Sequence, residues 1–215
     1  MEELEYRRGD APVGRTGLFG GLRMSWPRVA LSAAAAGIYT GAVLLIPGLA
    51  DTSFQDIGIS YEWWVLFAVV VVTNCAGPLE AAAKCFVFFL VSQPLVYGVE
   101  ILFGSLSLEM GLYYYRAIWL PATLLTLPGG FAAFFCKKQS VPGAVILGLG
   151  CAIEAMLGVW YAECAAGSFP HHLLSALFCA VCAVGLPLRL QKKPLCRAVA
   201  LGIPLLAAVG TFFLV

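Results

Sequence analysis

A single carboxylate stands in the middle of one apolar stretch of the chain. Residues 145 to 160 read VILGLGCAIEAMLGVW, and Glu154 is the only one of them that is neither apolar nor glycine. At 100° per residue, a helix places Glu154 on one face with Cys151 and Gly158, opposite a wholly apolar face. Because glycine leaves space beside the carboxyl group, this face is predicted to point toward a neighbouring helix or a narrow cavity.

Two chemical roles remain open for Glu154. A charged side chain at the centre of a membrane helix costs about 2.5–3.5 kcal/mol on insertion scales, and burial favours the neutral, protonated carboxyl group. A neutral Glu154 could donate a hydrogen bond to a neighbouring helix, which would be a structural role. An acid that exchanges its proton or binds a cation would instead be part of a functional site.

A second group of polar residues lies in the apolar segment 81–103. Glu100 falls near the outer end of this segment, and Gln93 and Tyr97 project near the same side of a helix. Pro94 lies between them, so their alignment depends on the geometry of a kink. The three residues predict a polar stripe that enters from outside and joins Glu154 in a candidate binding site for a small solute or ion.

Arg116 stands at the start of the apolar segment 113–135. It could neutralise Glu100, Glu109 or Glu154, and would then belong to the same binding site. Alternatively, its long side chain extends to the membrane interface, as basic residues near helix ends commonly do.

The cysteine pattern gives only a weak signal for redox chemistry. Cys179 and Cys182 form a CxxC spacing, but they lie inside an apolar segment, where cysteine commonly acts as a small apolar residue. The chain contains no HExxH, GxSxG, phosphate-loop or dinucleotide-binding pattern. We expect no cofactor, and the absence of these motifs disfavours an enzyme while leaving it as an alternative.

Two adjacent histidines, His171 and His172, precede the apolar segment 173–188 and follow Glu163 and Cys164. These four residue types can bind a metal ion. Adjacent residues of a helix point 100° apart, however, so both histidines cannot easily serve one ion. The expected role is an interfacial helix cap, and no metal site is expected.

Composition places the whole chain in a membrane. Of its 215 residues, 61% are hydrophobic and only 12% are charged, whereas soluble domains carry about 25% charged residues. The net charge of +1 gives no reason to expect nucleic acid as a partner. The expected fold is all-α, a polytopic bundle of about seven transmembrane helices in one domain, residues 28–215, after a charged cytoplasmic segment, residues 1–27. The expected spans are residues 29–50, 63–76, 81–103, 113–135, 141–162, 173–188 and 195–215.

Charge distribution predicts the orientation. With the N-terminus inside and the C-terminus outside, twelve of the thirteen basic residues lie on the cytoplasmic side and only Arg116 lies outside. Asp51, Asp56 and Glu163 then fall in outer loops or at the outer interface. Glu80 and Lys84 stand four residues apart on the inner side and are predicted to pair.

Small residues at four-residue spacing predict where the spans approach one another closely. Such stripes occur in three spans: Ala33, Gly37 and Gly41; Ala144, Gly148 and Ala152; and Ala198, Gly202, Leu206 and Gly210. Pro128, followed by two glycines, is expected to kink or loosen the inner end of the fourth span.

Several segments resemble a group of small uncharacterised bacterial membrane proteins. The resemblance covers roughly residues 37–138 and is carried by GIYTGAVLLIP, DTSFQDIGISYEWW, PLEAAAKCFVFFLVSQPLVYGVE and LPATLLTLPGG. It implies a multi-pass protein of the bacterial plasma membrane. It implies no activity, so no functional residue follows from it.

Three functions are compatible with these patterns. The first is the binding or passage of a small solute or ion at Glu154 and Glu100. The second is a subunit that does not transport and that binds a membrane protein partner in the lipid bilayer. The third is a membrane enzyme that acts on lipid at the outer face through Glu100, Glu163 or His171.

Overall fold

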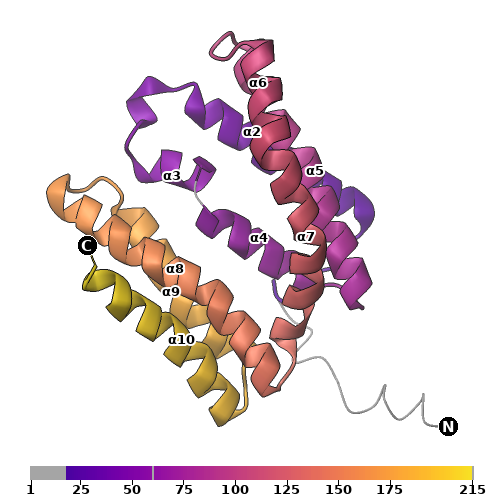
Figure 1. The fold of residues 1–215 in the computed structure, drawn as a ribbon, viewed down its shortest axis with the longest axis vertical. Coiled ribbons are helices and arrows are strands. Elements are labelled where there is room, and N and C mark those ends of the chain that lie inside the picture. The colour runs from indigo at the N-terminus through magenta and orange to yellow at the C-terminus, as the bar shows by residue number, and fades with distance from the viewer. Residues whose placement is uncertain (1–17, 60, 215) are drawn as a thin grey trace.

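The structure, a computed structural model, describes residues 18–59 and 61–214, together with the side chains outside residues 57–62. Within this part of the chain all regular structure is helical (Figure 1). Six helical segments are long and apolar enough to cross a membrane. They are α2 (Trp26–Leu44), α5 (Pro78–Leu102), the continuous segment Leu108–Lys137, α8 (Val141–Gly167), α9 (Leu173–Leu190) and α10 (Pro194–Phe212).

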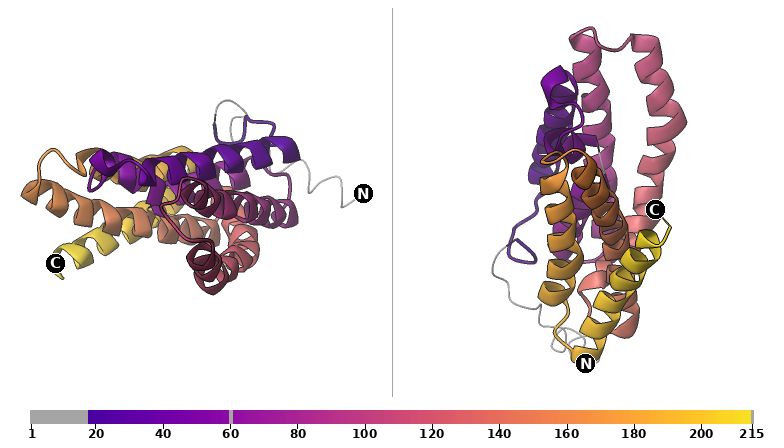
Figure 2. Two further views of the ribbon diagram at one scale, coloured as in Figure 1. Left: turned by 90° about the horizontal axis from the view of Figure 1, so that it is seen from above. Right: turned by 90° about the vertical axis from the view of Figure 1, so that its left-hand side faces the viewer.

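The helices form two groups with one helix between them. In the first group α2 packs on α5 and α5 packs on α7 (Leu120–Ala133); in the second, α8 packs on both α9 and α10. Helix α4 (Tyr61–Thr73) lies between the groups and contacts α5, α7 and α8 (Figures 1 and 2). The short helix α3 (Ser53–Ile59) precedes it and contacts α2 and α9.

The second expected span, residues 63–76, is shorter in the structure than predicted. Helix α4 has 13 residues, and at 1.5 Å per residue it is about 20 Å long, less than the roughly 30 Å of a hydrocarbon core. The helices α3 and α4 follow each other with only residue 60 between them. The segment before residue 63, expected to be a loop, is therefore largely helical.

Proline explains two further differences from the expected spans. The first span ends at Leu44 rather than at residue 50, because Pro47 has no N–H to continue the helix and holds Ile46 in an extended conformation. In the fourth span, a π-helical turn (Tyr115–Trp119) joins α6 (Leu108–Tyr114) to α7, just before Pro121. The expected loosening at Pro128 does not occur there, since α7 continues to Ala133 and a tighter 3-10 turn follows at Phe134–Lys137.

Small residues set the closest helix contacts, as predicted for two of the three stripes. A Cβ atom added at Gly37 would lie 2.3 Å from the Ser92 carbonyl oxygen of α5, and one at Gly148 would lie 2.8 Å from Ile203 of α10. The prediction for the last span is wrong. Cβ atoms added at Gly202 and Gly210 would have no neighbouring atom within 4 Å, so no helix packs closely there. Helix α10 instead buries the residues of another face, which are Cys196, Ala200 and Pro204.

We expect Gly37→Ala to destabilise the fold, because the new methyl group must push apart the backbones of α2 and α5. Forced overpacking of this kind typically costs about 1–3 kcal/mol. The matched control is Gly98→Ala in α5, where the added methyl group meets open space and helix propensity favours alanine by about 1 kcal/mol. Thermal unfolding in detergent should rank Gly37→Ala below the parent and Gly98→Ala at or above it. Equal melting temperatures for the two variants would contradict the close helix contact.

One end of the bundle carries Lys137, Lys138, Lys192 and Lys193, and we call it the basic end. A hydrogen-bond network closes this end. Gln191 is fully buried, and its Nε2 donates to the Cys136 carbonyl oxygen at 2.7 Å. Gln139 completes the reciprocal contact by donating to the Leu190 carbonyl oxygen and accepting from the Lys192 N–H, both at 2.7 Å. These bonds satisfy the backbone groups where α9 ends, which would otherwise have no intrahelical partner.

Two lysines hold the other group of helices at this end. Lys137 donates to the Cys75 carbonyl oxygen at 2.6 Å, just after α4 ends. Lys84 is buried and pairs with Glu80, which confirms the predicted contact; it also donates to the Met24 carbonyl oxygen. Side chains thus tie the loops of both groups together at the basic end.

Candidate functional site

Glu154 lies in the middle of α8 with 0% of its surface exposed. The residues on its face, Cys151 and Tyr161, are buried as well, whereas Leu149 and Met156 on the opposite side are exposed. This burial pattern confirms that the carboxylate face of the helix points into the bundle.

Helix α9 covers this face of α8. A Cβ atom added at Gly158 would lie 3.1 Å from the Cβ of Cys179, so the two helices touch one turn above Glu154. One turn below it, the Cys151 thiol lies 4.0 Å from the Cys182 carbonyl oxygen. The interface between α8 and α9 therefore encloses the carboxyl group from both directions along the helix.

A polar cluster of three helices lies beyond this interface, toward the end of α8. Oδ2 of Asp56, in α3, accepts hydrogen bonds from Nδ1 of His172 at 2.8 Å and from Oγ of Ser175 at 2.7 Å. The side chains of His172 and Asp56 are only 13% and 11% exposed. The ring of Tyr161, from α8, stacks on His172 with centroids 5.9 Å apart. We call Asp56, His172, Ser175 and Tyr161 the outer cluster.

The start of α9 explains why these residues meet. His172 precedes the helix with a left-handed φ of 60°, a conformation in which histidine is enriched among non-glycine residues. The backbone N–H of Ser175, in the first turn of α9, donates to the Ser53 hydroxyl of α3 at 3.3 Å. The Asp56 carboxylate also lies near the positive end of the α9 helix dipole. The Ser53 side chain of α3 therefore caps the N-terminus of α9, which has no capping side chain of its own.

The outer cluster corrects one sequence interpretation. His172 makes no side-chain cap of α9; it pairs with Asp56, which the sequence placed in an outer loop. Among the described side chains, no group of three candidate metal ligands comes together, including His171, Glu163 and Cys164. Sequence reasoning missed the outer cluster. The one available signal was that Ser53 and Asp56, three residues apart, share a face of a short helix.

The hydrogen bonds of the outer cluster indicate what it can do chemically. A serine nucleophile needs its hydroxyl bonded to a basic histidine nitrogen. Here Ser175 and His172 both bond to the same oxygen of Asp56, so this arrangement does not activate the serine. A carboxylate, an imidazole and a hydroxyl at these distances can instead bind and pass a proton.

The remaining predicted site residues lie in the other group of helices. Gln93 is 2% exposed within α5, and its Nε2 has no hydrogen-bond partner among the described residues. The ring of Tyr97 stacks on Tyr114, with centroids 6.5 Å apart. Glu100 is half-buried at the end of α5. These residues share one helix, which α4 separates from α8 and Glu154 (Figure 1).

Of the two alternatives for Arg116, the pairing with a carboxylate is not seen among the described side chains. Arg116 is exposed on the π-helical turn. Among the described side chains, ion pairs form between Glu80 and Lys84 and between Asp56 and His172. The reason is geometric, because the π turn directs Arg116 to the surface rather than toward Glu100 or Glu154.

The cysteines behave as apolar residues in the fold. Seven of the eight are buried, including Cys179 and Cys182 of the CxxC spacing. In the loop before α5, burial raises the pKa of the Cys75 thiol to about 11, so this group stays protonated at neutral pH.

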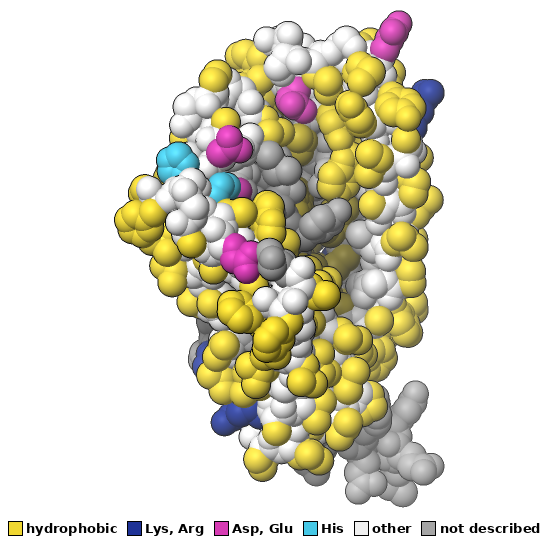
Figure 3. Space-filling model, turned by 60° about the vertical axis from the view of Figure 1, so that its left-hand side comes forward, with side chains coloured by type: hydrophobic (Ala, Val, Ile, Leu, Met, Phe, Trp, Pro, Cys, Tyr) yellow, Lys and Arg dark blue, Asp and Glu magenta, His cyan; other side chains and the backbone are white. Residues whose placement is uncertain are grey.

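Acidic side chains lie mainly toward one end of the molecule and basic side chains mainly toward the other. In Figure 3, acidic and histidine side chains gather in the upper half of one face, and most of the visible basic side chains lie at the lower end. Large apolar side chains are exposed between the ends, among them Leu31, Leu125 and Leu206. An exposed apolar surface with polar ends is typical of a protein that is solvated by lipid.

Comparison with known proteins gives no relative: no family model, no curated protein and no solved structure matches the chain. The class of protein therefore follows from the fold alone. The chain is an apolar helical bundle compatible with an integral membrane protein, and its described part contains six helices long enough to span the bilayer.

Proposed function

We propose that this bundle lies in a bacterial plasma membrane with its basic end in the cytoplasm and its acidic end outside. The positive-inside distribution of lysine and arginine supports this orientation, and the resemblance of residues 37–138 to bacterial membrane proteins supports the location. The exposed leucines along the helices support insertion, since they would otherwise face water.

Reporter fusions test the orientation. A reporter fused after Lys138 should be cytoplasmic, because Lys137, Lys138 and the loop after Leu190 lie together at the basic end. A reporter fused after Val215 should be external. Alkaline phosphatase and green fluorescent protein give opposite signals on the two sides, so each fusion has an internal control. Cytoplasmic location of both fusions would remove one span from the bundle.

We propose further that the protein binds or passes a proton or a small cation at Glu154. The observation that carries this proposal is the burial of Glu154 at mid-helix, on the face that leads to the outer cluster. Tyr161 lies seven residues further along this face, about 10 Å away along the helix axis, and stacks on His172. Ionisable groups inside a membrane domain commonly mark ion or proton pathways.

The test is ion movement by the purified full-length chain in proteoliposomes. A pH-sensitive dye trapped inside the vesicles should report proton entry when the outside is made acidic. The same experiment with a sodium or potassium gradient identifies a cation that moves with or instead of the proton. Vesicles without protein give the background. Rates equal to this background under all three gradients would contradict the proposal.

A second candidate function is a subunit that binds a membrane protein partner. It is favoured by the uncovered face of α10, where Ala198 and Gly210 are exposed beside Leu206. Small residues on an exposed helix face permit close approach of another helix. This candidate differs from the first in that it requires no ion movement and no ionisable group at position 154.

A further inference from the structure

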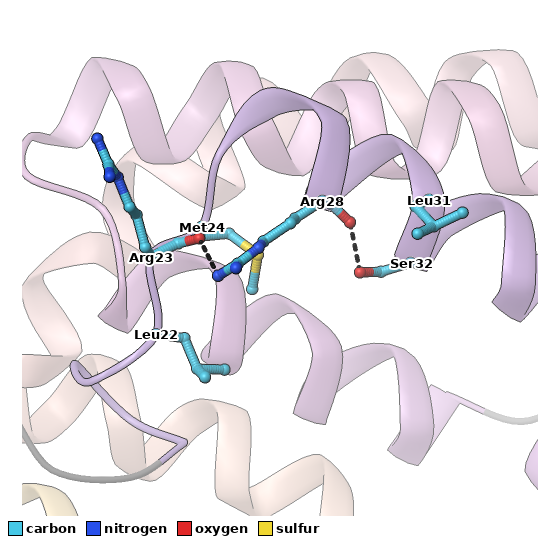
Figure 4. Close-up of a pocket in the computed structure, with 6 residues that line it drawn as sticks. All are labelled: Leu22, Arg23, Met24, Arg28, Leu31 and Ser32. Carbon is cyan, nitrogen blue, oxygen red and sulfur yellow. Dashed lines mark hydrogen bonds between the residues drawn. The ribbon is translucent and has the colours of Figure 1, made fainter.

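The basic end of the bundle holds a recess whose chemistry has no role in the proposed ion path. Its volume is about 200 Å³, and it lies where the chain enters α2 (Figure 4). The recess is lined by Leu22, Arg23, Met24, Arg28, Leu31 and Ser32. The lining thus combines two arginines with apolar side chains; Arg28 reaches back toward the Arg23 carbonyl group, whereas the Arg23 side chain points away from it (Figure 4).

The backbone around this recess is fixed by hydrogen bonds. Nη1 of Arg28 reaches back over the turn and donates to the Arg23 carbonyl oxygen at 2.9 Å (Figure 4). The buried Lys84 of α5 donates to the Met24 carbonyl oxygen and lies 5.6 Å from the ring of Trp26. One hydrogen bond thus holds the exposed Arg28 side chain across the turn, and Lys84 fixes the backbone at Met24.

The positive charge of the recess is not neutralised within the described part of the chain. Neither Arg23 nor Arg28 takes part in an ion pair there, and the nearby acid Glu80 is occupied by Lys84. The N-terminus of α2 begins at Trp26, so the positive end of its dipole adds to the same potential. An anion is the complementary ligand.

The apolar part of the lining identifies the kind of anion. Leu31 is 72% exposed on the membrane-facing side of α2, one turn beyond Arg28. A ligand that places an anionic group against the arginines and an acyl chain along Leu31 satisfies both halves of the recess. Basic recesses at the cytoplasmic ends of membrane helices are typical binding sites for anionic lipid headgroups.

We propose that this recess binds the phosphodiester headgroup of an anionic phospholipid from the inner leaflet. The guanidinium of Arg28 holds the phosphate, and the exposed side chain of Arg23 rotates from its position in Figure 4 to contact it from the preceding turn. The proposal rests on the proposed membrane orientation but not on Glu154, so ion movement and lipid binding can fail independently.

The test is lipid retention and thermal stability of the full-length chain in a neutral detergent. Phosphatidylglycerol should be retained in native mass spectrometry and should raise the melting temperature in a saturable way, whereas phosphatidylcholine should do neither. The variant Arg23→Gln/Arg28→Gln should bind phosphatidylglycerol roughly tenfold or more weakly, as expected when charge-assisted hydrogen bonds are lost. The matched control is Arg116→Gln, which removes an exposed arginine at the opposite end and should leave lipid binding unchanged.

Two additional arms keep the test decisive. Arg23→Gln alone tests the site if the double variant does not fold, because no hydrogen bond of the Arg23 side chain holds the described fold; it should still weaken lipid binding. Inorganic phosphate should not reproduce the stabilisation, since it lacks the acyl chain. Equal stabilisation by phosphate would overturn the lipid assignment, as would equal binding of both lipids or equal loss of binding in Arg116→Gln.

Discussion

Glu154→Gln should abolish ion movement and leave the fold intact. Glutamine keeps the volume and the hydrogen-bonding capacity of glutamic acid but cannot ionise, so the substitution removes only the exchangeable proton. Because the site is fully buried and the shape is conserved, the change in unfolding free energy should stay below about 1.5 kcal/mol. The measurement is proton or cation entry into proteoliposomes, together with thermal unfolding of the same preparation.

The matched control for this experiment is Glu163→Gln on the same helix. Glu163 lies near the outer end of α8 and is only partly buried, so its substitution should leave both transport and stability near the parent values. Glu154→Leu adds a further comparison, because it also removes hydrogen bonding. Parent-like ion movement in Glu154→Gln would contradict the proposed role of the carboxylate. Parent-like stability of Glu154→Leu would in addition show that the residue does not hold the helices together.

Asp56→Ala should destabilise the protein strongly. The carboxylate accepts two hydrogen bonds, from His172 and Ser175, and joins α3 to α9. Removing it leaves two nearly buried donors without an acceptor, which costs roughly 1–3 kcal/mol each. For a chain of this size, 1 kcal/mol shifts the melting temperature by about 2–4 °C. The two donors together amount to about 2–6 kcal/mol, so a decrease of roughly 4–24 °C is expected in thermal unfolding.

Double substitutions separate this coupling from a general loss of packing. Asp56→Ala combined with His172→Ala should cost less than the sum of the single changes, because residues in one hydrogen-bond network are not additive. Glu109→Ala is the control for removal of an exposed carboxylate from the same end of the molecule. If Asp56→Ala were no less stable than Glu109→Ala, the outer cluster would not hold α3 against α9.

The sequence by itself determined the helical class and the faces of single helices. The low charge content and long apolar segments predicted spanning helices at nearly the observed bounds of α5, α8 and α9. The 3.6-residue period placed Glu154 on an interior face because the opposite face of α8 carries only apolar residues. Four-residue spacing of small residues likewise predicted that Gly37 lies on a packing face, since glycine allows close approach of another helix.

The tertiary structure alone decided which helix covers which face. Asp56 and His172 are 116 residues apart in the chain, and no periodicity relates them. The packing face of α10 was also not predictable, because lipid tails are as apolar as leucine and the pattern does not separate a lipid-facing side from a helix-facing one. The 3.6-residue period of a helix predicts which of its faces points inward. Which helix packs against that face depends on how all the helices fit together. For this reason the sequence found Glu154, and only the fold brought α3 and α9 together above it.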